Sequence, residues 1–381
     1  MTAARLVARC VRGLETVVAA EILQSDGVTV TRLGHREVHF RAGASGWRAA
    51  STADDVFLLA GACPDIGPGR EGLGALAELA AAVDALGVVR LRERYTGGGA
   101  LTGVEVSASF LGRRRFNRYD VEDAVGPVLA RRLGVGYHSR RSGAVPAATG
   151  GGWRLAMDGV RASLMLRVGE RPLHRRAYKG ITLPGSLHPP VAAAMARLAG
   201  VQAGDTVLDP CCGAGTLLIE AYLQQPGSHL YGFDLSPAAV RAARRNAAGA
   251  PAADTDRLLI GDGSPPPVGW PGGGVRSAVP ISVEQADAGR LPVPGGVADR
   301  VLCNPPWGAQ VGAGGTLAGD PSAWWRELRR VLAPGGTAVL LLPGGGDIAT
   351  GIGHGFVPEH VQRIRLSGAQ PYIVRFAAPG R

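Results

Sequence analysis

The stretch Thr206-Val-Leu-Asp-Pro-Cys-Cys-Gly-Ala-Gly-Thr216 decides the fold of the second half of this chain. A short apolar run followed by a glycine-rich turn predicts a buried strand that leads directly into a helix. Gly213 and Gly215 let the backbone approach a ligand, and a helix beginning at Thr216 adds exposed N–H groups. Leu218 stands where a dinucleotide-binding G-x-G-x-x-G turn has its third glycine. The turn therefore disfavours a pyrophosphate and suits a nucleoside.

The same alternation of strand and helix continues on both sides of this turn. Short apolar runs bounded by Gly, Pro or Asp predict buried parallel strands at Thr206–Leu208, Leu230–Phe233, Ile281–Val283, Val301–Cys303 and Ala338–Leu342. Helices are expected at Val191–Leu198, Thr216–Gln224, Pro237–Asn246 and Trp324–Leu332, with a turn at Pro334-Gly335-Gly336 after the last. An edge hairpin is expected from Val361–Leu366 and Tyr372–Phe376. This order predicts a doubly wound parallel sheet, which binds ligands at the carboxyl ends of its strands.

The first half has a different pattern, which predicts one or two small α+β domains. Helices are expected near Leu14–Gln24, Leu73–Leu86 and Val121–Leu133, and strands at Val38–Phe40, Val104–Phe110 and Ser163–Val168. Three glycine-rich segments predict loops, at Gly97–Gly99, Gly143–Gly152 and Gly261–Gly274.

Positive charge is concentrated in the first half. Residues 1–190 carry a net charge of +9, against +1 for residues 191–381, which favours a polyanion as partner of the first half; a basic solvated surface is the alternative. The basic residues gather in three clusters: Arg113, Arg114, Arg115 and Arg118; Arg131, Arg132, Arg140 and Arg141; and Arg171, Arg175, Arg176 and Lys179. The middle cluster also fits a solvated helix end. Phe116, Tyr119 and Tyr178 lie among these residues and could stack on unpaired bases.

Composition and cysteine spacing exclude several classes of protein. The longest uncharged apolar runs, such as Thr337–Leu342, are too short to span a bilayer, and no signal peptide follows Arg5 and Arg9. The five cysteines are scattered, odd in number and without C-x-x-C spacing. We therefore expect a cytoplasmic protein with no metal site, no disulfide and no membrane partner.

Two carboxylates follow strands of the second half. Asp234 ends a predicted strand about 20 residues beyond the glycine turn, where an acidic residue accepts hydrogen bonds from ribose hydroxyls; a helix-start residue is the alternative. Asp287 follows the strand at Ile281–Val283 and could meet the amino group of adenine, or could cap a turn. Together with the glycine turn, these positions suit the nucleoside of S-adenosylmethionine.

The tetrapeptide Asn304-Pro305-Pro306-Trp307 follows another predicted strand. Prolines fix the backbone and lack N–H groups, so the carbonyl of Pro305 is a rigid acceptor. With the side-chain oxygen of Asn304 it offers two acceptors for an NH₂ group on a planar base, and Trp307 offers a face for stacking. Accepting both protons directs the nitrogen lone pair toward an electrophilic methyl group. An ordinary Asn-Pro turn is the alternative.

These motifs resemble those of the THUMP-domain RNA guanine-N2 methyltransferases. The resemblance includes Cys10-Val-Arg-Gly-Leu-Glu15, Arg115-Phe-Asn-Arg-Tyr-Asp-Val-Glu-Asp123 and Leu173-His-Arg-Arg-Ala-Tyr178, and so covers nearly the whole chain. It implies an α/β protein in which a Rossmann-like, seven-stranded methyltransferase domain follows α+β ferredoxin-like and THUMP domains. The implied domains are 1–65 (ferredoxin-like), 66–172 (THUMP, RNA-binding), 173–188 (linker) and 189–381 (methyltransferase).

The resemblance also implies an activity and a set of site residues. The expected reaction is methyl transfer from S-adenosylmethionine to the N2 amino group of a guanosine in tRNA, with position 6 of the acceptor stem favoured. The implied catalytic residues are Asn304, Pro305 and Trp307; the cofactor-binding residues are Asp209, Cys211, Gly213, Gly215, Thr216, Asp234, Asp287 and Asn304; and the RNA-binding residues are Arg113, Arg114, Arg115, Arg118, Arg175, Arg176 and Lys179.

The chain departs from the family pattern at two positions. Cys211 stands where an aromatic residue is usual, and Trp307 replaces a tyrosine, which keeps stacking but changes the pocket size. We expect neither Cys211 nor Cys212 to act as a nucleophile. A 23S ribosomal RNA guanine-N2 methyltransferase is the close alternative. A small-molecule N-methyltransferase that retains the basic arm and a non-catalytic RNA-binding protein are further alternatives, and both monomer and homodimer stay open.

Overall fold

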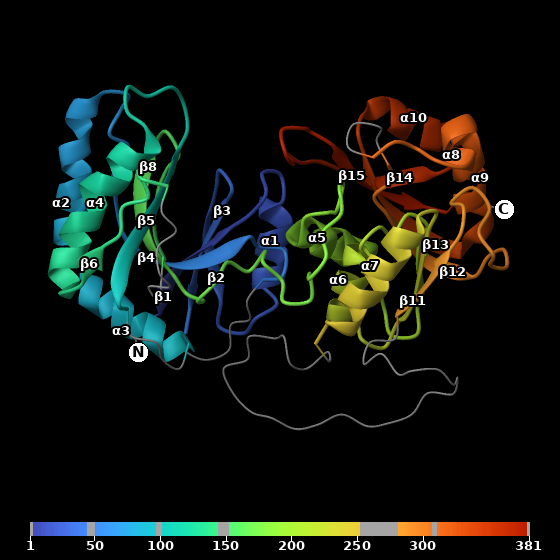
Figure 1. The fold of residues 1–381 in the computed structure, drawn as a ribbon, viewed down its shortest axis with the longest axis horizontal. Helices are drawn as coiled ribbons and strands as arrows, with labels where there is room; N and C mark the ends of the chain where they lie inside the picture. Colours follow the sequence, from blue (N-terminus) through green and yellow to red (C-terminus); the bar gives the residue numbers. More distant parts are fainter. Residues whose placement is uncertain are drawn as a thin grey trace. The chain divides into compact units, whose positions relative to one another are not determined.

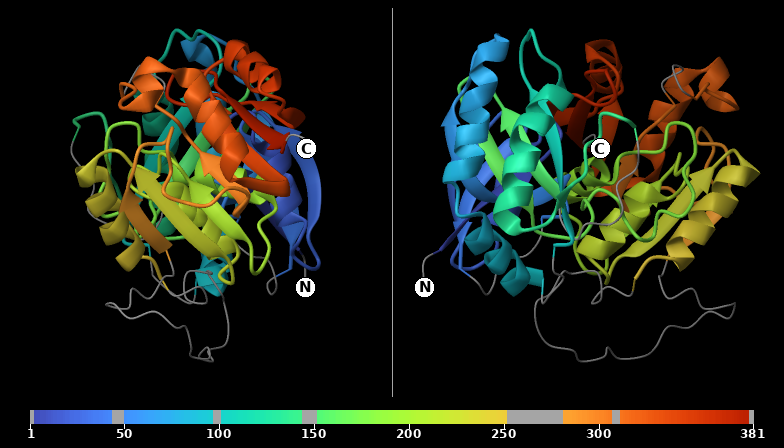
Figure 2. Two further views of the ribbon diagram at one scale, coloured as in Figure 1. Left: turned by 90° about the vertical axis from the view of Figure 1, so that its right-hand side faces the viewer. Right: turned by 60° about the vertical axis from the view of Figure 1, so that its left-hand side comes forward.

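The computed structural model describes residues 3–43, 50–96, 101–143, 152–251, 281–306 and 311–378. Trp307, the Gly97–Gly99 segment, the Gly261–Gly274 segment and most of Gly143–Gly152 therefore lie outside the described residues. The chain forms two compact units, each built on its own sheet (Figures 1 and 2). The first unit consists of Met1–Cys10 and Val18–Leu173, and the second of Val11–Val17 and His174–Arg381.

The first unit contains an eight-stranded sheet in the order β2-β3-β1-β4-β8-β7-β5-β6. Its strands are β1 (Ala4–Arg9), β2 (Thr29–Gly34), β3 (Glu37–Ala42), β4 (Asp55–Pro64), β5 (Gly103–Phe110), β6 (Gly136–Tyr137), β7 (Gly152–Met157) and β8 (Arg161–Arg167). Strand β4 pairs antiparallel with both β1 and β8, so residues on both sides of position 65 contribute to one continuous sheet.

The helices of the first unit are α1 (Glu15–Ile22), of which the part from Val18 onward belongs to this unit, η1 (Arg70–Gly72), α2 (Leu73–Ala82), α3 (Ala85–Thr96) and α4 (Arg118–Leu133). Helices α2 and α4 pack together along one face of the sheet (Figure 1). Their buried residues, including Leu76 and Val125, form one apolar core with Trp153 and Leu164 of the strands. The predicted helix near Leu14–Gln24 and the strands near Val38–Phe40, Val104–Phe110 and Ser163–Val168 are confirmed.

Local capping explains where two helices differ from the prediction. Helix α4 begins three residues before the expected Val121, because the Asn117 side chain accepts hydrogen bonds from the N–H groups of Tyr119 and Asp120 while the Asp120 carboxylate accepts from the Asn117 N–H. The single helix expected at Leu73–Leu86 is two helices. The backbone at Val83 is extended, which ends the first helix. The Asp84 side chain then accepts a hydrogen bond from the Gly87 N–H and caps the start of the second helix.

The second unit contains the predicted doubly wound sheet, with seven strands in the order β11-β10-β9-β12-β13-β15-β14. The strands are β9 (Thr206–Asp209), β10 (His229–Asp234), β11 (Ile281–Gln285), β12 (Ala298–Cys303), β13 (Leu332–Leu342), β14 (Val357–Arg363) and β15 (Tyr372–Ala377). The first five are parallel, and β14 and β15 form the predicted antiparallel pair at one edge. The predicted parallel strands and the fold class are confirmed, and β15 matches the predicted Tyr372–Phe376, whereas β14 begins four residues before the expected Val361 and ends at Arg363.

Helices cover the sheet of the second unit on both faces (Figure 2). They are α5 (Pro189–Ala199), α6 (Thr216–Gln224), α7 (Pro237–Ala248), α8 (Thr316–Gly319), α9 (Pro321–Val331) and α10 (Gly345–Gly353). Helix α9 buries Trp324 and Trp325 against alternate residues of β13, such as Ala338 and Leu340. Every second side chain of β13 therefore faces α9, as expected for a strand buried on both faces.

The predicted turn at Pro334-Gly335-Gly336 lies inside β13 instead of before it. Strand pairing begins immediately after α9, because Leu332 is already opposite Ala298. The next pair joins Thr337 to Arg300, so the residues between bulge out of the ladder, with Gly335 at a φ of +76°.

Among the described residues, no single helix is long and apolar enough to cross a membrane. The segments Arg70–Ala82 and Ala85–Thr96 meet that test only as a pair bent by 62°. Within the same residues there is no group of three His, Cys, Asp or Glu side chains able to hold a metal ion.

Candidate active site

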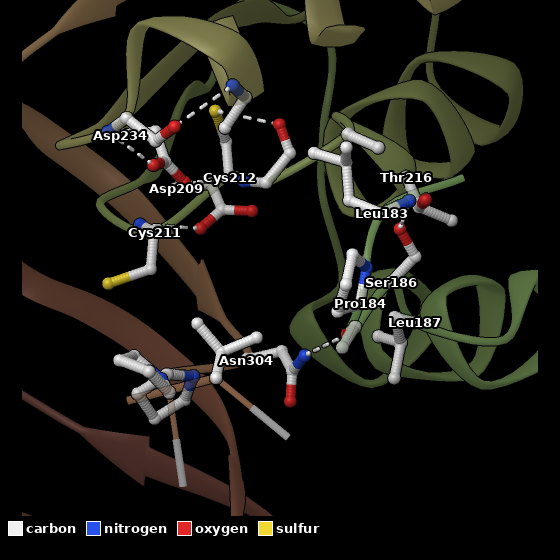
Figure 3. Close-up of a pocket in the computed structure, with 18 of the residues that line it drawn as sticks. Leu183, Pro184, Ser186, Leu187, Asp209, Cys211, Cys212, Thr216, Asp234 and Asn304 are labelled. Atoms are coloured by element: carbon white, nitrogen blue, oxygen red, sulfur yellow. Dashed lines mark hydrogen bonds between the residues drawn. The ribbon is translucent and has the colours of Figure 1, made fainter. Parts of the chain in front are cut away.

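A cavity of about 970 Å³ lies in the second unit, at the carboxyl ends of β9, β10 and β12 (Figure 3). Each of these strands is followed by one segment that sequence analysis singled out. Eight of the predicted catalytic and cofactor-binding residues in the described part of the chain line the cavity: Asp209, Cys211, Gly213, Thr216, Asp234, Asp287, Asn304 and Pro305. The parallel sheet thus brings together side chains that are almost 100 residues apart.

Gly215 is the predicted cofactor residue that does not line the cavity in the described structure. It has a φ of +80° at the N-cap of α6, and a Cβ there would lie 3.2 Å from that of Ala243. The glycine therefore serves the turn and the close approach of the start of α6 to Ala243 of α7.

Asp209 stabilises the backbone of the glycine-rich turn. Its carboxylate is buried and accepts a hydrogen bond from the Cys211 N–H at 3.1 Å. Burial raises the pKa of Asp209 well above its ordinary value, and the nearby charge of Asp234 adds to that effect. Burial likewise raises the pKa of the Cys212 and Cys303 thiols, which disfavours the nucleophilic thiolate form of both.

Asp234 connects the glycine turn to the start of α7. One carboxylate oxygen accepts from the Gly213 N–H and the other from the Ser236 N–H, each at 2.9 Å. Ser236 in turn caps α7 by accepting from the Ala239 N–H. Asp234 therefore does act at the start of α7, as the alternative interpretation expected. Each of its carboxylate oxygens also keeps a lone pair for a ligand in the cavity.

Asp287 caps a turn as well as lining the cavity. Its carboxylate accepts from the Gly289 N–H and from both the N–H and the hydroxyl of Thr316. Burial acts to raise the pKa of Asp287, but these hydrogen bonds outweigh it and hold the pKa below its ordinary value. An ionised, immobilised carboxylate stands at this end of the cavity.

Asn304 is oriented by a backbone carbonyl. Its amide nitrogen donates to the carbonyl of Gly185 at 3.3 Å, so the NH₂ half of the amide faces that carbonyl and the oxygen is the other half (Figure 3). No described residue donates a hydrogen bond to the Asn304 oxygen. The side chain therefore presents a fixed, unused acceptor at the wall of the cavity.

The turn that orients Asn304 was missed by sequence reasoning. In the turn from Leu183 to Ser186 the Leu183 carbonyl accepts from the Ser186 N–H, and Gly185 adopts a φ of +75°. Proline followed by glycine is the signature of a type II turn, and that signal was available at Pro184. The segment lies in the predicted linker at 173–188, yet it forms one wall of the cavity.

Comparison with known proteins agrees with this geometry. Residues 176–258 match the family described as RMKL-like, methyltransferase domain. The chain is 32% identical over 272 residues to the tRNA (guanine(6)-N2)-methyltransferase of Thermus thermophilus, an alignment covering 70% of each protein. The structure resembles that of TrmN from Thermus thermophilus, with a TM-score of 0.69, 26% identity and coverage of 98% of this chain and 99% of that one.

The chain belongs to the family of RNA guanine-N2 methyltransferases. It is an S-adenosylmethionine-dependent enzyme, with S-adenosylmethionine as its methyl donor. The fold is shared with SMU.472, solved in complex with S-adenosylhomocysteine, at a TM-score of 0.65, 15% identity and coverage of 100% of this chain and 99% of that one.

The cavity of the methyltransferase fits this cofactor. The hydroxyl of Thr216 is buried beside the cavity, and its oxygen has no hydrogen-bond partner among the described residues. A buried polar atom without a partner is costly, so such an atom at a cavity wall indicates a missing ligand atom.

Two residues predicted to bind RNA belong to the interior of the methyltransferase unit. The Arg176 guanidinium donates to both oxygens of the buried Glu220, at 2.8 and 3.3 Å, and Tyr178 donates to the same carboxylate at 2.6 Å. Lys179 lines the cofactor cavity and donates to the Leu187 carbonyl. The predicted RNA contact of Arg176 and base stacking on Tyr178 are therefore wrong, whereas the predicted RNA contact of Lys179 stays a prediction; Arg175, directly before Arg176, is exposed.

The same correction applies in the first unit. Arg114 is only 7% exposed and donates to both oxygens of Asp65, at 2.7 and 2.8 Å, so it has no free face for a phosphate. Phe116 is buried edge-to-face against Phe110 and cannot stack on a base. The remaining residues of that predicted cluster are exposed: Arg113, Arg115 and Arg118. In the middle cluster, Arg140 and Arg141 pair with acidic residues of β5 and α4.

Proposed function

We propose that this enzyme methylates the N2 amino group of a guanosine in the acceptor stem of tRNA, with position 6 as the favoured target. The observation that carries the proposal is the Asn304 side-chain oxygen, held unused at the cavity wall by the Gly185 carbonyl. The relative that covers 70% of the chain is named for position 6 of tRNA, which supports this choice of nucleotide.

We infer that Asn304 and Pro305 hold the target amino group as two acceptors. The Asn304 oxygen accepts one proton and the carbonyl of the buried Pro305 accepts the other. With both protons engaged, the nitrogen lone pair leaves conjugation with the ring. S-adenosylmethionine supplies the electrophilic methyl group. No strong base is required before transfer, because the proton becomes acidic on methylation, and positioning supplies most of the rate.

We infer that the nucleoside of the cofactor is held by the other predicted residues. Asp234 keeps a lone pair on each oxygen to accept hydrogen bonds from the ribose hydroxyls. The Asp287 carboxylate accepts a hydrogen bond from the adenine amino group. Gly213 and Cys211 form the turn against which the nucleoside packs, above the buried Asp209. Trp307 is proposed to stack on the target base from outside the described residues.

We further propose that the domains keep the predicted bounds of 1–65, 66–172, 173–188 and 189–381, and that residues 1–190 supply the RNA affinity of a cytoplasmic enzyme. The excess positive charge of that half supports the assignment. The proposed RNA contacts are those predicted arginines that are exposed: Arg113, Arg115, Arg118 and Arg175.

The nucleotide assignment can be tested with transcripts that differ at one position. A tRNA with guanosine at position 6 should accept one or more methyl groups on N2, identified by mass spectrometry of the nucleosides. The same tRNA with inosine there should accept none, because inosine lacks only the N2 amino group. Equal methylation of both transcripts would move the target elsewhere in tRNA. Methylation of 23S ribosomal RNA in place of tRNA would favour the alternative substrate.

RNA affinity should depend on the exposed arginines before and within the first turn of α4. Replacing Arg113, Arg115 and Arg118 by glutamine should lower the salt dependence of RNA binding, with the slope of log K against log salt reduced by roughly 2 to 3 units. Filter binding between about 50 and 200 mM salt measures that slope. The matched control is Arg114→Gln, which should lower thermal stability through the loss of its pair with Asp65 and leave the slope unchanged. An unaltered slope in the triple variant would assign the RNA contact to another surface.

A further inference from the structure

Helix α6 begins at the cavity wall without a capping side chain. Its N-cap is Gly215, which has no side chain to accept from the first N–H groups of the helix. Those N–H groups lack partners inside the helix and carry partial positive charge. The Thr216 hydroxyl in the same turn is buried, with 3% of the residue exposed, and has no partner among the described residues. The two features together indicate that an anionic oxygen of a ligand completes this turn.

Lys179 is the cation beside that turn. It is the only Lys or Arg among the described residues that line the cavity, which also has three aspartates. Lys179 donates to the carbonyl of Leu187, which lies on the same side of the cavity as Thr216 (Figure 3), and the charge of Glu220 acts to raise its pKa. Burial nevertheless lowers the pKa of Lys179.

The ammonium of Lys179 is incompletely satisfied by the protein. One proton is donated to the Leu187 carbonyl at 2.6 Å, which leaves two donors. Glu220 is engaged by Arg176 and Tyr178, and within the described part of the chain no carboxylate lies at ion-pair distance from Lys179. A half-buried cation with two spare donors favours an anionic ligand.

We propose that Lys179, Thr216 and the first turn of α6 bind the carboxylate of the methionine half of S-adenosylmethionine. The assignment rests on the proposed position of the cofactor in this cavity. Asp234 and Cys211 lie on one side of the cavity, and Thr216 and Leu187 lie on the other (Figure 3). The carboxylates of Asp234 and Asp287 repel an anion from the nucleoside side, so the cofactor carboxylate is directed to the side that has the cation.

Two ligands that differ in the amino-acid half test this assignment by calorimetry. S-adenosylhomocysteine has the carboxylate, whereas 5′-methylthioadenosine has the same nucleoside and thioether without it. Lys179→Gln should weaken S-adenosylhomocysteine binding by about 10- to 100-fold and change methylthioadenosine binding by less than about threefold. Lys179→Arg, which keeps the charge, should recover part of the loss. Thr216→Val should show the same selectivity with a smaller loss.

Two further variants separate this assignment from the position of the cofactor. Asp234→Asn should weaken both ligands alike, because both have the ribose. Arg241→Gln, which removes an exposed charge from α7, should change neither. If Lys179→Gln weakens both ligands equally, or neither, the carboxylate assignment is overturned while the nucleoside site stands. If the wild-type protein binds neither ligand, the proposed cofactor site fails and this assignment fails with it.

Discussion

Replacing Asn304 by alanine is expected to lower the single-turnover rate of methyl transfer by on the order of 10²- to 10³-fold or more, comparable to the loss of one positioned hydrogen-bonding group in other enzymes. The physical reason is the loss of the acceptor that directs the nitrogen lone pair. The Asn304 oxygen is fixed by the donation of its amide to Gly185, so water cannot reproduce its position.

Binding measurements separate a chemical role from a structural one for Asn304. The residue follows β12, whereas the proposed nucleoside contacts follow β9, β10 and β11, so affinity for S-adenosylhomocysteine should change by less than about threefold. The matched variant is Asn304→Asp, which has the same shape but loses the donor that faces the Gly185 carbonyl. It should be nearly as slow as the alanine variant. A rate near that of the wild type in either variant would mean that the amino group is held elsewhere.

The parts of this structure that sequence predicted are those specified by local pattern. Strand–helix alternation, the glycine turn and the residues at the strand ends follow from the periodicity of apolar residues and from backbone restrictions. Because parallel strands place their carboxyl ends at one edge, predicting the strands also brought Asp209, Asp234 and Asn304 to one cavity.

What sequence did not predict depends on partners distant in the chain. Arg113, Arg114 and Arg115 look alike in sequence, and only the position of Asp65, 49 residues earlier, removes the middle one from the surface. The same is true of Gly185, whose carbonyl meets an amide 119 residues later. Strand β4, with Asp55 and Gly61 in its course, lacks the clean alternation of a half-buried strand and was not predicted.

Arg175 and Arg176 are adjacent, yet a substitution at Arg176 is expected to lower stability and one at Arg175 to weaken RNA binding. Arg176→Gln removes the cation from a carboxylate that is 1% exposed, so the second unit should lose about 3–5 kcal/mol of unfolding free energy. For a unit of this size that corresponds to a fall of roughly 6 to 20 °C in Tm. RNA affinity of the folded protein should be unchanged.

Arg175→Gln should leave Tm unchanged and reduce the slope of log K against log salt for RNA binding by about 1.

A double variant shows whether the cost in Arg176→Gln arises from an unpaired buried charge. Replacing the pair by Met at Arg176 and Leu at Glu220 removes both charges and keeps the volume, so it should recover much of the lost stability. Recovery should be incomplete, because the Tyr178 hydroxyl loses the acceptor to which it donates at 2.6 Å. Thermal unfolding followed by circular dichroism measures both steps. An Arg176→Gln protein with wild-type Tm and a reduced salt slope would return Arg176 to the RNA-binding surface, since a surface contact alone loses affinity without loss of stability.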